Sequence, residues 1–164
     1  MGMRLKDKEI TDPAVLEAIL RKGQVLHLGL ADVGGQPYVV PLGYGYAPGE
    51  VVLHGAMKGL KLDLIRQNPR VSFNVVLRPE LVRNPDPTEY SMRYISVIGT
   101  GEAEILEDPT EKQRCLDVLM GQYGGPQDPL PEEALARTAV IRLRVTSLTG
   151  KFSGYPKPLS PQDL

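Results

Sequence analysis

Residues 52–73, VLHGAMKGLKLDLIRQNPRVSF, decide the fold, because they predict a strand, a small-residue turn, a helix and a second strand. The turn holds His54 and two glycines, with Lys58 and Lys61 where the helix begins. The first N–H groups of a helix have no partner inside it, and the helix dipole favours negative charge there. The stretch therefore predicts a phosphate site. The alternative is an ordinary turn with solvated lysines, which is common on protein surfaces.

Length and composition bound what the chain can do. With 164 residues it is expected to form a single domain, 1–164, with about 153–164 as a surface tail. A net charge of −1 offers no basic surface for nucleic acid. One cysteine excludes an internal disulfide and fits a reducing cytoplasm, where we expect the protein to reside. No apolar run approaches the roughly 18 residues of a membrane span, and residues 1–6 contain no apolar signal core, so no membrane partner is expected.

The first elements follow local signals. Asp12 and Pro13 predict the start of a helix that Gly23 ends. Residues 24–31 alternate with period two, and the Gly34-Gly35 turn joins this strand to a second one at 37–46.

The strand predicted at 37–46 has one nearly bare face. Pro37, Pro41, Gly43 and Gly45 share that face with Val39, while larger side chains alternate on the other. Proline inside a strand requires an edge or a bulge, and glycine admits something close to the backbone. A flat ring stacked on the strand would need such a face. An irregular edge strand without a ligand explains the pattern equally well.

Further along the chain, Asp108 and Glu111 predict the capped start of a helix, and its apolar face is expected to consist of Cys115, Leu116, Leu119, Met120 and Tyr123. The other expected elements are strands at 51–54, 71–77, 90–107 (with bends at Gly99 and Gly101) and 139–148, helices at 59–67 and 131–136, and a long exposed loop at 78–89. About six strands joined by short turns favour antiparallel pairing. We therefore expect a mainly β fold, a small barrel with flanking helices.

The order of these pieces resembles the flavin-binding split-barrel family that includes pyridoxamine 5′-phosphate oxidase, and within it most closely the nitroimidazole-resistance branch. The resemblance covers roughly residues 4–152. The segments that carry it are Gln36 to Tyr44, His54 to Ala56, Gly59 to Leu62, Asn68 to Val71, Tyr94 to Val97, Gly101 to Ala103, Glu111-Lys112 and Leu148 to Lys151. No single motif decides the match, but their order and spacing together are fairly specific.

The resemblance implies an antiparallel split β-barrel that forms a homodimer and binds two FMN molecules, each between protomers. By position, the flavin ring would be lined by Val40, Pro41, Leu42 and Gly43, and the ribityl chain and phosphate would be held by His54, Gly55, Ala56, Gly59 and Lys61. Ser96 stands where the oxidases carry a glutamine that contacts the flavin. His54 is the candidate for steering a substrate or a proton, the alternatives being a phosphate ligand or a core histidine.

The sequence departs from the family in two places. Leu60 stands where many relatives have an arginine, which removes one charge-assisted phosphate contact unless Lys58 or Arg66 replaces it. The C-terminus lacks tryptophan and the arginine-rich segment that binds the substrate phosphate in the true oxidases, so pyridoxamine phosphate is not the expected substrate.

Few other residues suggest chemistry. His27 lies on a strand face away from the leucines and is expected at a surface or interface, and Cys115 is expected to be a small buried hydrophobe. Two distant histidines and one cysteine do not predict a metal site. Tyr44, Tyr46 or Tyr94 could flank a ring.

The leading hypothesis is an FMN-dependent oxidoreductase that uses NAD(P)H or another reductant to reduce small electron-poor acceptors such as nitro compounds or quinones. The second hypothesis is a flavin- or haem-binding module without turnover. The third is an interaction domain that kept the barrel and lost the cofactor.

Overall fold

Antiparallel strand pairing organises the computed structural model, which describes residues 5–158 and 160–164. The described part of the chain contains eight strands, four α-helices and three short 3₁₀ turns. The strands are β1 (Glu9–Ile10), β2 (Val25–Ala31), β3 (Pro37–Gly43), β4 (Gly45–Ala47), β5 (Glu50–Ala56), β6 (Arg70–Val82), β7 (Ser91–Leu106) and β8 (Thr138–Ser153). The helices are α1 (Pro13–Lys22), α2 (Leu60–Gln67), α3 (Pro109–Gln122) and α4 (Glu132–Arg137), and the 3₁₀ turns are η1 (Lys6–Lys8), η2 (Pro87–Glu89) and η3 (Pro161–Asp163).

The chain divides into two compact units, and neither is a continuous stretch of sequence. One contains residues 5–23, 74–98 and 148–164, and the other contains residues 24–73 and 99–147. Because the long strands β6, β7 and β8 continue from one unit into the other, no linker in the sequence separates them.

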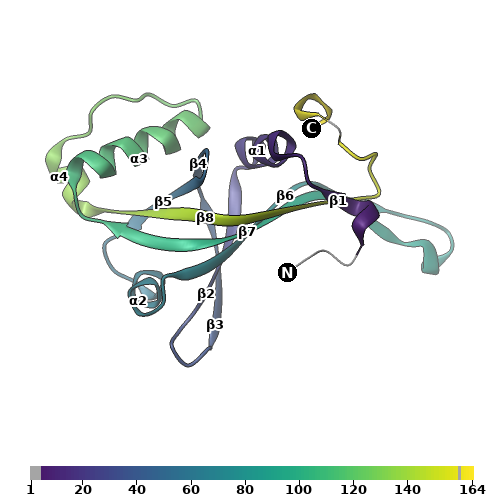
Figure 1. Cartoon of the computed structure of the whole chain (residues 1–164), viewed down its shortest axis with the longest axis horizontal. Coiled ribbons are helices and arrows are strands. Elements are labelled where there is room, and N and C mark those ends of the chain that lie inside the picture. Colours follow the sequence, from purple (N-terminus) through teal and green to yellow (C-terminus); the bar gives the residue numbers. More distant parts are fainter. Residues whose placement is uncertain (1–4, 159) are drawn as a thin grey trace. The chain divides into compact units, whose positions relative to one another are not determined.

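The unit formed by residues 24–73 and 99–147 holds most of the sheet. Its strands follow the order β3-β2-β6-β7-β8-β5-β4, with antiparallel pairing of β2 with β3, β4 with β5 and β5 with β8. Helix α3 lies against β4 and β5 with α4 beside it, and α2 packs on β2 (Figure 1). This architecture is mainly antiparallel β with helices at its margins and agrees with the predicted split barrel.

Apolar alternation explains why this sheet has one buried face. Leu26, Leu28 and Leu30 of β2 are at most 4% exposed, whereas Val25 and His27 point to the exposed side, as predicted. A second cluster lies under α3 and consists of Val52, Leu106, Cys115, Leu116, Leu119, Leu135 and Val140. Cys115 is fully buried there, which confirms its prediction as a buried hydrophobe.

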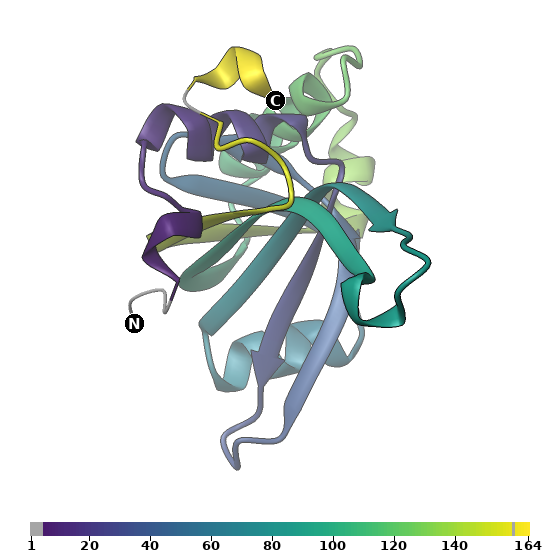
Figure 2. The same ribbon diagram turned by 90° about the vertical axis from the view of Figure 1, so that its right-hand side faces the viewer.

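The other unit is built around α1. The Asp12 carboxylate accepts a hydrogen bond from the Ala14 N–H at the predicted helix start. The strand β1, absent from the sequence prediction, pairs with the last part of β8 through Ile10 and Gly150. The predicted surface tail lies beside α1 through η3 (Figure 2), where Lys22 donates a hydrogen bond to the Leu164 carbonyl. Residues 1–4 and Leu159, to which the expectations for the N-terminus and tail also extended, lie outside the described residues.

Several element boundaries differ from the prediction; β8, for example, extends to Ser153 beyond the strand expected at 139–148. The strand expected at 37–46 breaks at Tyr44, because β3 pairs with β2 whereas β4 pairs with β5. The loop expected at 78–89 is wrong for residues 78–82, which extend β6. Glu80 in this extension forms an ion pair with Arg93 of β7 and accepts a hydrogen bond from the Tyr155 hydroxyl. Such long-range partners cannot be read from local composition.

Within the described residues, each helix is too short or too polar to cross a lipid bilayer.

Candidate functional site

The turn between β5 and α2 has the backbone geometry of an anion site. Gly59 precedes α2 with φ of 139°, a region that favours glycine, and no side chain caps the helix there. The earliest helical bonds run from the Leu62 and Asp63 N–H groups to the Gly59 carbonyl. The N–H groups before them therefore have no acceptor inside the helix and are available to a ligand.

Lys61 brings its charge to the same turn. Its Nζ atom lies 3.1 Å from the position that a Cβ atom would take on Gly55, so the missing side chain of Gly55 leaves room for the ammonium group. Burial lowers the pKa of Lys61 below its ordinary value of 10.5. A partly desolvated ammonium beside uncapped helix N–H groups is complementary to a phosphate.

The other two cations near the turn are placed differently. Arg66 forms an ion pair with Asp63 at 3.1 Å on the exposed side of α2. Lys58 is exposed, and so is Leu60, at 55%. Arg66 therefore has a carboxylate partner of its own, which weighs against it as a substitute for the arginine that many relatives carry at the position of Leu60.

The predicted ring-lining residues lie at the end of β3, which is in contact with β5. Pro41 and Gly43 are exposed, while Val40 and Leu42 on the opposite face are half-buried. The expected alternation is therefore present up to Gly43. Beyond it, Tyr44 and Tyr46 are buried, and burial raises the pKa of Tyr44 above its ordinary value.

Part of the bare face of the strand predicted at 37–46 receives α3. A Cβ atom on Gly45 would lie 2.5 Å from the Leu119 Cα atom, so only glycine permits this approach of helix and strand. A Cβ atom on Gly43 would lie 2.5 Å from the hydroxyl oxygen of Tyr123, which donates a hydrogen bond to the Gln24 carbonyl. The absence of side chains at these two glycines thus serves packing within the chain.

His54 lies on β5 opposite Val140 of β8, on the strand face that carries Val52. Val52 is buried under α3, whereas His54 and Ala56 are exposed. His54 lines a cavity of about 410 Å³ that opens below the C-terminal half of α3. His54 therefore lies both at the start of the phosphate-type turn and in the wall of this cavity.

Ser96, the remaining predicted site residue, is on β7 in the other unit, together with Tyr94. Its side chain is 6% exposed. Around it, Val97 accepts a hydrogen bond from the Asn74 side chain at its carbonyl, and the Lys151 ammonium lies 5.4 Å from the centre of the Tyr94 ring. The nine other predicted residues all belong to the unit that contains the turn.

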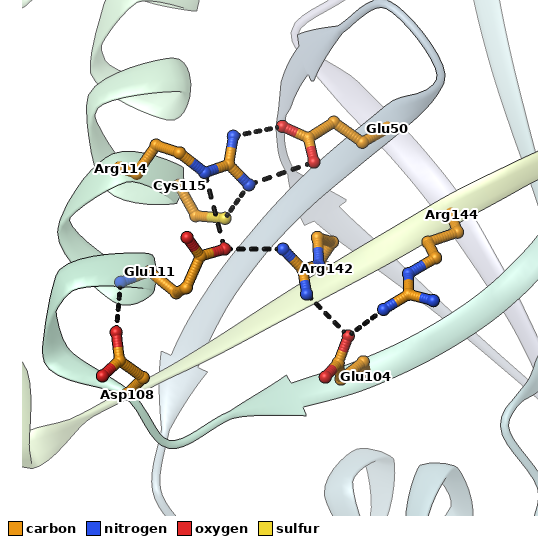
Figure 3. A network of polar contacts seen from close by, with 8 residues as sticks. All are labelled: Glu50, Glu104, Asp108, Glu111, Arg114, Cys115, Arg142 and Arg144. Carbon is orange, nitrogen blue, oxygen red and sulfur yellow. Dashed lines mark hydrogen bonds and ion pairs between the residues drawn. The ribbon is translucent and has the colours of Figure 1, made fainter.

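A network of charges fixes α3 on the sheet (Figure 3). The Arg114 guanidinium donates to both carboxylate oxygens of Glu50 on β5, at 2.7 and 3.2 Å. Arg142 of β8 bonds Glu111 of α3 at 2.7 Å and Glu104 of β7 at 2.9 Å. These hydrogen bonds hold the pKa of Glu104 below its ordinary value and raise that of Arg142. Helix α3 is thereby tied directly to β5 and β8, and through Arg142 to β7.

A buried lysine fixes the other side of α3. Lys112 is 6% exposed, and its ammonium group donates hydrogen bonds to the carbonyls of Leu135 and Thr138, each at 3.1 Å. These carbonyls lie at the C-terminal end of α4, where the helix dipole favours a positive charge. Lys112 is therefore a structural cation that joins α3 to α4.

The chain shares its sequence pattern with known proteins. A model of the family described as pyridoxamine 5′-phosphate oxidase matches residues 12–152. The chain belongs to this family. The solved structure of a candidate 5-nitroimidazole antibiotic resistance protein from Bacteroides thetaiotaomicron is 31% identical over 88% of this chain and 86% of that one, with a TM-score of 0.78.

Two further structures of similar proteins share the fold. The FAD- and haem-binding protein from Mycobacterium smegmatis has a TM-score of 0.80 at 22% identity, over 95% of this chain and 78% of that one. The flavocytochrome Anf3 from Azotobacter vinelandii has a TM-score of 0.78 at 20% identity, over 99% and 77%. A comparison with curated protein sequences found no match. Membership of the pyridoxamine 5′-phosphate oxidase family therefore rests on the family model and on the structure that is 31% identical.

Sequence reasoning missed the part of the site that α3 and the loop after it contribute. Tyr123 and Met120 were expected only as members of an apolar helical face, and Gln113, Asp117 and Asp128 were not singled out. The one available signal was the loop at 124–131, which has three prolines between two helices. Such a segment often carries function in a rigid fold.

Proposed function

We propose that this protein is an FMN-binding oxidoreductase that acts on small electron-poor acceptors such as nitro compounds. The observation that carries the proposal is the turn at 54–61, where Lys61 and the uncapped start of α2 meet beside Gly55. Membership of the pyridoxamine 5′-phosphate oxidase family and the likeness to a candidate nitroimidazole-resistance protein support it.

The residues present fit a flavin mononucleotide. Its phosphate would be held by the Lys61 ammonium and by the N–H groups at the start of α2, since Gly55 and Gly59 leave room for it. The exposed Pro41 face of β3 is apolar and flat enough for a ring edge. The contact of Ser96 with the flavin stays a prediction from the family resemblance.

The chemistry that a bound flavin supplies is hydride transfer between a reduced nicotinamide and an electron-poor acceptor. The residues of the chain would bind and orient this group: Lys61 would anchor the phosphate, and the exposed Pro41 face of β3 would support the ring. His54, exposed beside this region, is the candidate to hold or deliver a proton to an acceptor through its imidazole.

We also propose a homodimer. Val25 of β2 and Val39 of β3 are 49% and 62% exposed, and both stand on the side of the strands away from the buried leucines. Large apolar side chains in such positions favour a partner surface. Light scattering coupled to size exclusion should give twice the 18.0 kDa chain mass, and a monomer would contradict this part of the proposal.

The decisive experiment compares FMN with riboflavin, which lacks the phosphate, by calorimetric titration of the purified protein. Lys61→Met should weaken FMN binding about 10- to 100-fold, as expected for loss of one charge-assisted hydrogen bond of roughly 1.5–3 kcal/mol. It should leave riboflavin binding unchanged. Lys157→Met, at an exposed lysine outside the turn, serves as the control and should alter neither affinity.

Turnover is then tested anaerobically with NADH or NADPH and a nitro compound. Bleaching of the flavin absorption followed by its return on addition of the nitro compound supports a reductase. A bound flavin that neither nicotinamide reduces would favour a binding module without turnover. Failure to bind FMN at micromolar concentrations would refute the proposed function.

A further inference from the structure

The cavity beside His54 is walled mainly by α3 and the loop that follows it. It has a volume of about 410 Å³ and is lined by His54, Gln113, Leu116, Asp117, Leu119, Met120, Pro126, Asp128, Pro129, Leu130 and Thr138. Small-molecule pockets commonly measure about 300–1,000 Å³. This volume suits a molecule of one or two rings.

Hydrogen bonds hold the loop in place over the cavity. The Leu130 N–H donates to the Gln113 side-chain carbonyl at 2.8 Å, and the Gln127 side-chain amide donates to the Asp117 carbonyl at 3.0 Å. At the start of the loop, the Gly125 N–H donates to the Met120 carbonyl at 2.9 Å. The cavity is therefore a formed part of the fold, attached to α3 at three points.

Apart from the imidazole of His54, the charged groups in the wall are negative. The two carboxylates that line the cavity are those of Asp117 and Asp128, and the described residues of its lining include no lysine or arginine. The Gln113 amide donates to one Asp117 oxygen at 2.7 Å, so this carboxylate is held in position. Since apolar walls weaken solvent screening, a negative ligand is disfavoured here and a neutral or positive one is accepted.

The position of His54 connects the cavity to the turn that binds phosphate in the proposed function. The next residue, Gly55, faces the Lys61 ammonium on the opposite face of β5, because side-chain positions alternate along a strand. The phosphate-type turn and the acidic cavity thus share one end of β5, lie on opposite faces of that strand, and carry opposite charges.

We propose that this cavity binds the acceptor substrate, and that the substrate is a small flat aromatic molecule that is neutral or positively charged. The class includes nitro-substituted heterocycles and amines and excludes phosphate esters and carboxylates. The inference rests on the proposed function for the role of acceptor, while the binding site itself is testable without turnover.

The test is calorimetric titration of the intact protein with three compounds of one shape, 4-nitrobenzyl alcohol, 4-nitrobenzylamine and 4-nitrobenzoate. The alcohol and the amine should bind at least tenfold more tightly than the carboxylate. Met120→Trp, which fills the cavity, should weaken both about tenfold or more and leave the FMN affinity unchanged. Val33, at the tip of the β2–β3 hairpin, is 81% exposed, so Val33→Trp is the matched control. It should change neither the affinity for the alcohol and the amine nor the affinity for FMN.

A second variant keeps the test decisive if Met120→Trp disturbs folding. Asp128 is exposed, so Asp128→Lys is expected to fold normally and to reduce the preference for the amine over the carboxylate at least tenfold. Equal binding of all three compounds, or unchanged preference in Asp128→Lys, would overturn the inference. Displacement of the amine by FMN would also overturn it, because the cavity would then belong to the cofactor site.

The two proposals fail separately. In one outcome, FMN does not bind, the amine binds, and Met120→Trp abolishes binding of the amine. The cavity is then a ligand site and the proposed flavin function is wrong. If FMN binds and Met120→Trp leaves the binding of the amine unchanged, the flavin function stands and the cavity inference is wrong.

Discussion

The ammonium nitrogen of Lys61 lies 3.1 Å from the point that a Cβ atom would occupy on Gly55. In Gly55→Ala the new methyl group should push the flexible end of Lys61 aside without unfolding the turn. We expect FMN affinity to fall about three- to tenfold with little change in the melting temperature. Titration with FMN measures this, and Gly34→Ala in the distant β2–β3 hairpin is the control. Unchanged affinity in Gly55→Ala would show that Lys61 does not hold the phosphate.

The binding of FMN should depend on pH through Lys61. Burial lowers the pKa of Lys61 below 10.5, so the unfolded chain holds this proton more tightly than the folded one. The free protein should gain stability as pH rises from the lowered pKa to 10.5, while FMN affinity falls because the ammonium is lost. Lys61→Arg should keep its affinity over the same interval. Titrations with FMN between pH 7 and 10.5 measure the affinities of the parent and of Lys61→Arg. Riboflavin is the control ligand, and its affinity is expected not to change with pH.

The close approach of α3 to β4 should make Gly45 intolerant of any side chain. A methyl group there would lie 2.5 Å from the Leu119 Cα atom and 2.7 Å from its nitrogen, both rigid backbone atoms. We expect Gly45→Ala to lower the free energy of unfolding by about 1–3 kcal/mol, the usual cost of overpacking. Urea denaturation measures the loss. A Gly45→Ala protein as stable as the parent would mean that α3 does not lie this close to the strand.

Loss of the Lys112 ammonium should be costly because both of its carbonyl partners are left without it. Lys112→Met keeps the length and apolar stem of the side chain but leaves the Leu135 and Thr138 carbonyls without this donor. We expect a loss of about 2–4 kcal/mol in unfolding free energy. The exposed Lys58→Met should change stability by less than about 0.5 kcal/mol. A small effect of Lys112→Met would indicate that water replaces the ammonium.

The charge network on α3 should respond to acid. Hydrogen bonds from Arg142 lower the pKa of Glu104 below its ordinary value of 4.5. Its contribution to stability is therefore complete above pH 4.5 and is lost as the pH falls through the lowered pKa. In Glu104→Gln, the decline of the melting temperature below pH 4.5 should be shallower than in the parent. Identical pH profiles would show that the network is fully screened by solvent.

Local signals in the sequence were sufficient where one segment determines its own structure. The aspartates at positions 12 and 108 cap the helices that they were predicted to start. The alternating leucines of β2 are buried on the predicted side, and the turn before α2 lies where glycine spacing placed it. Each of these features depends on neighbours within about four residues.

Features that depend on distant segments could not be predicted. The bare face of the strand predicted at 37–46 was visible in the sequence, but Tyr123 and Leu119, which use it, come about 75 residues later. The extension of β6 to Val82 relies on partners in β7 and on Tyr155. The cavity was missed for the same reason, since His54 and Leu130 are brought together only by the packing of α3 on β5.

The loop at 124–131 is attached to α3 through side chains of Gln113 and Gln127 and through one backbone bond, whereas the turn at 54–61 connects β5 to α2. Insertions or substitutions in that loop can therefore reshape the hollow without altering the residues proposed to hold the cofactor. Natural variants of this protein can therefore differ in their acceptor substrate while they keep the same flavin. Directed evolution of the loop alone can exploit this modularity.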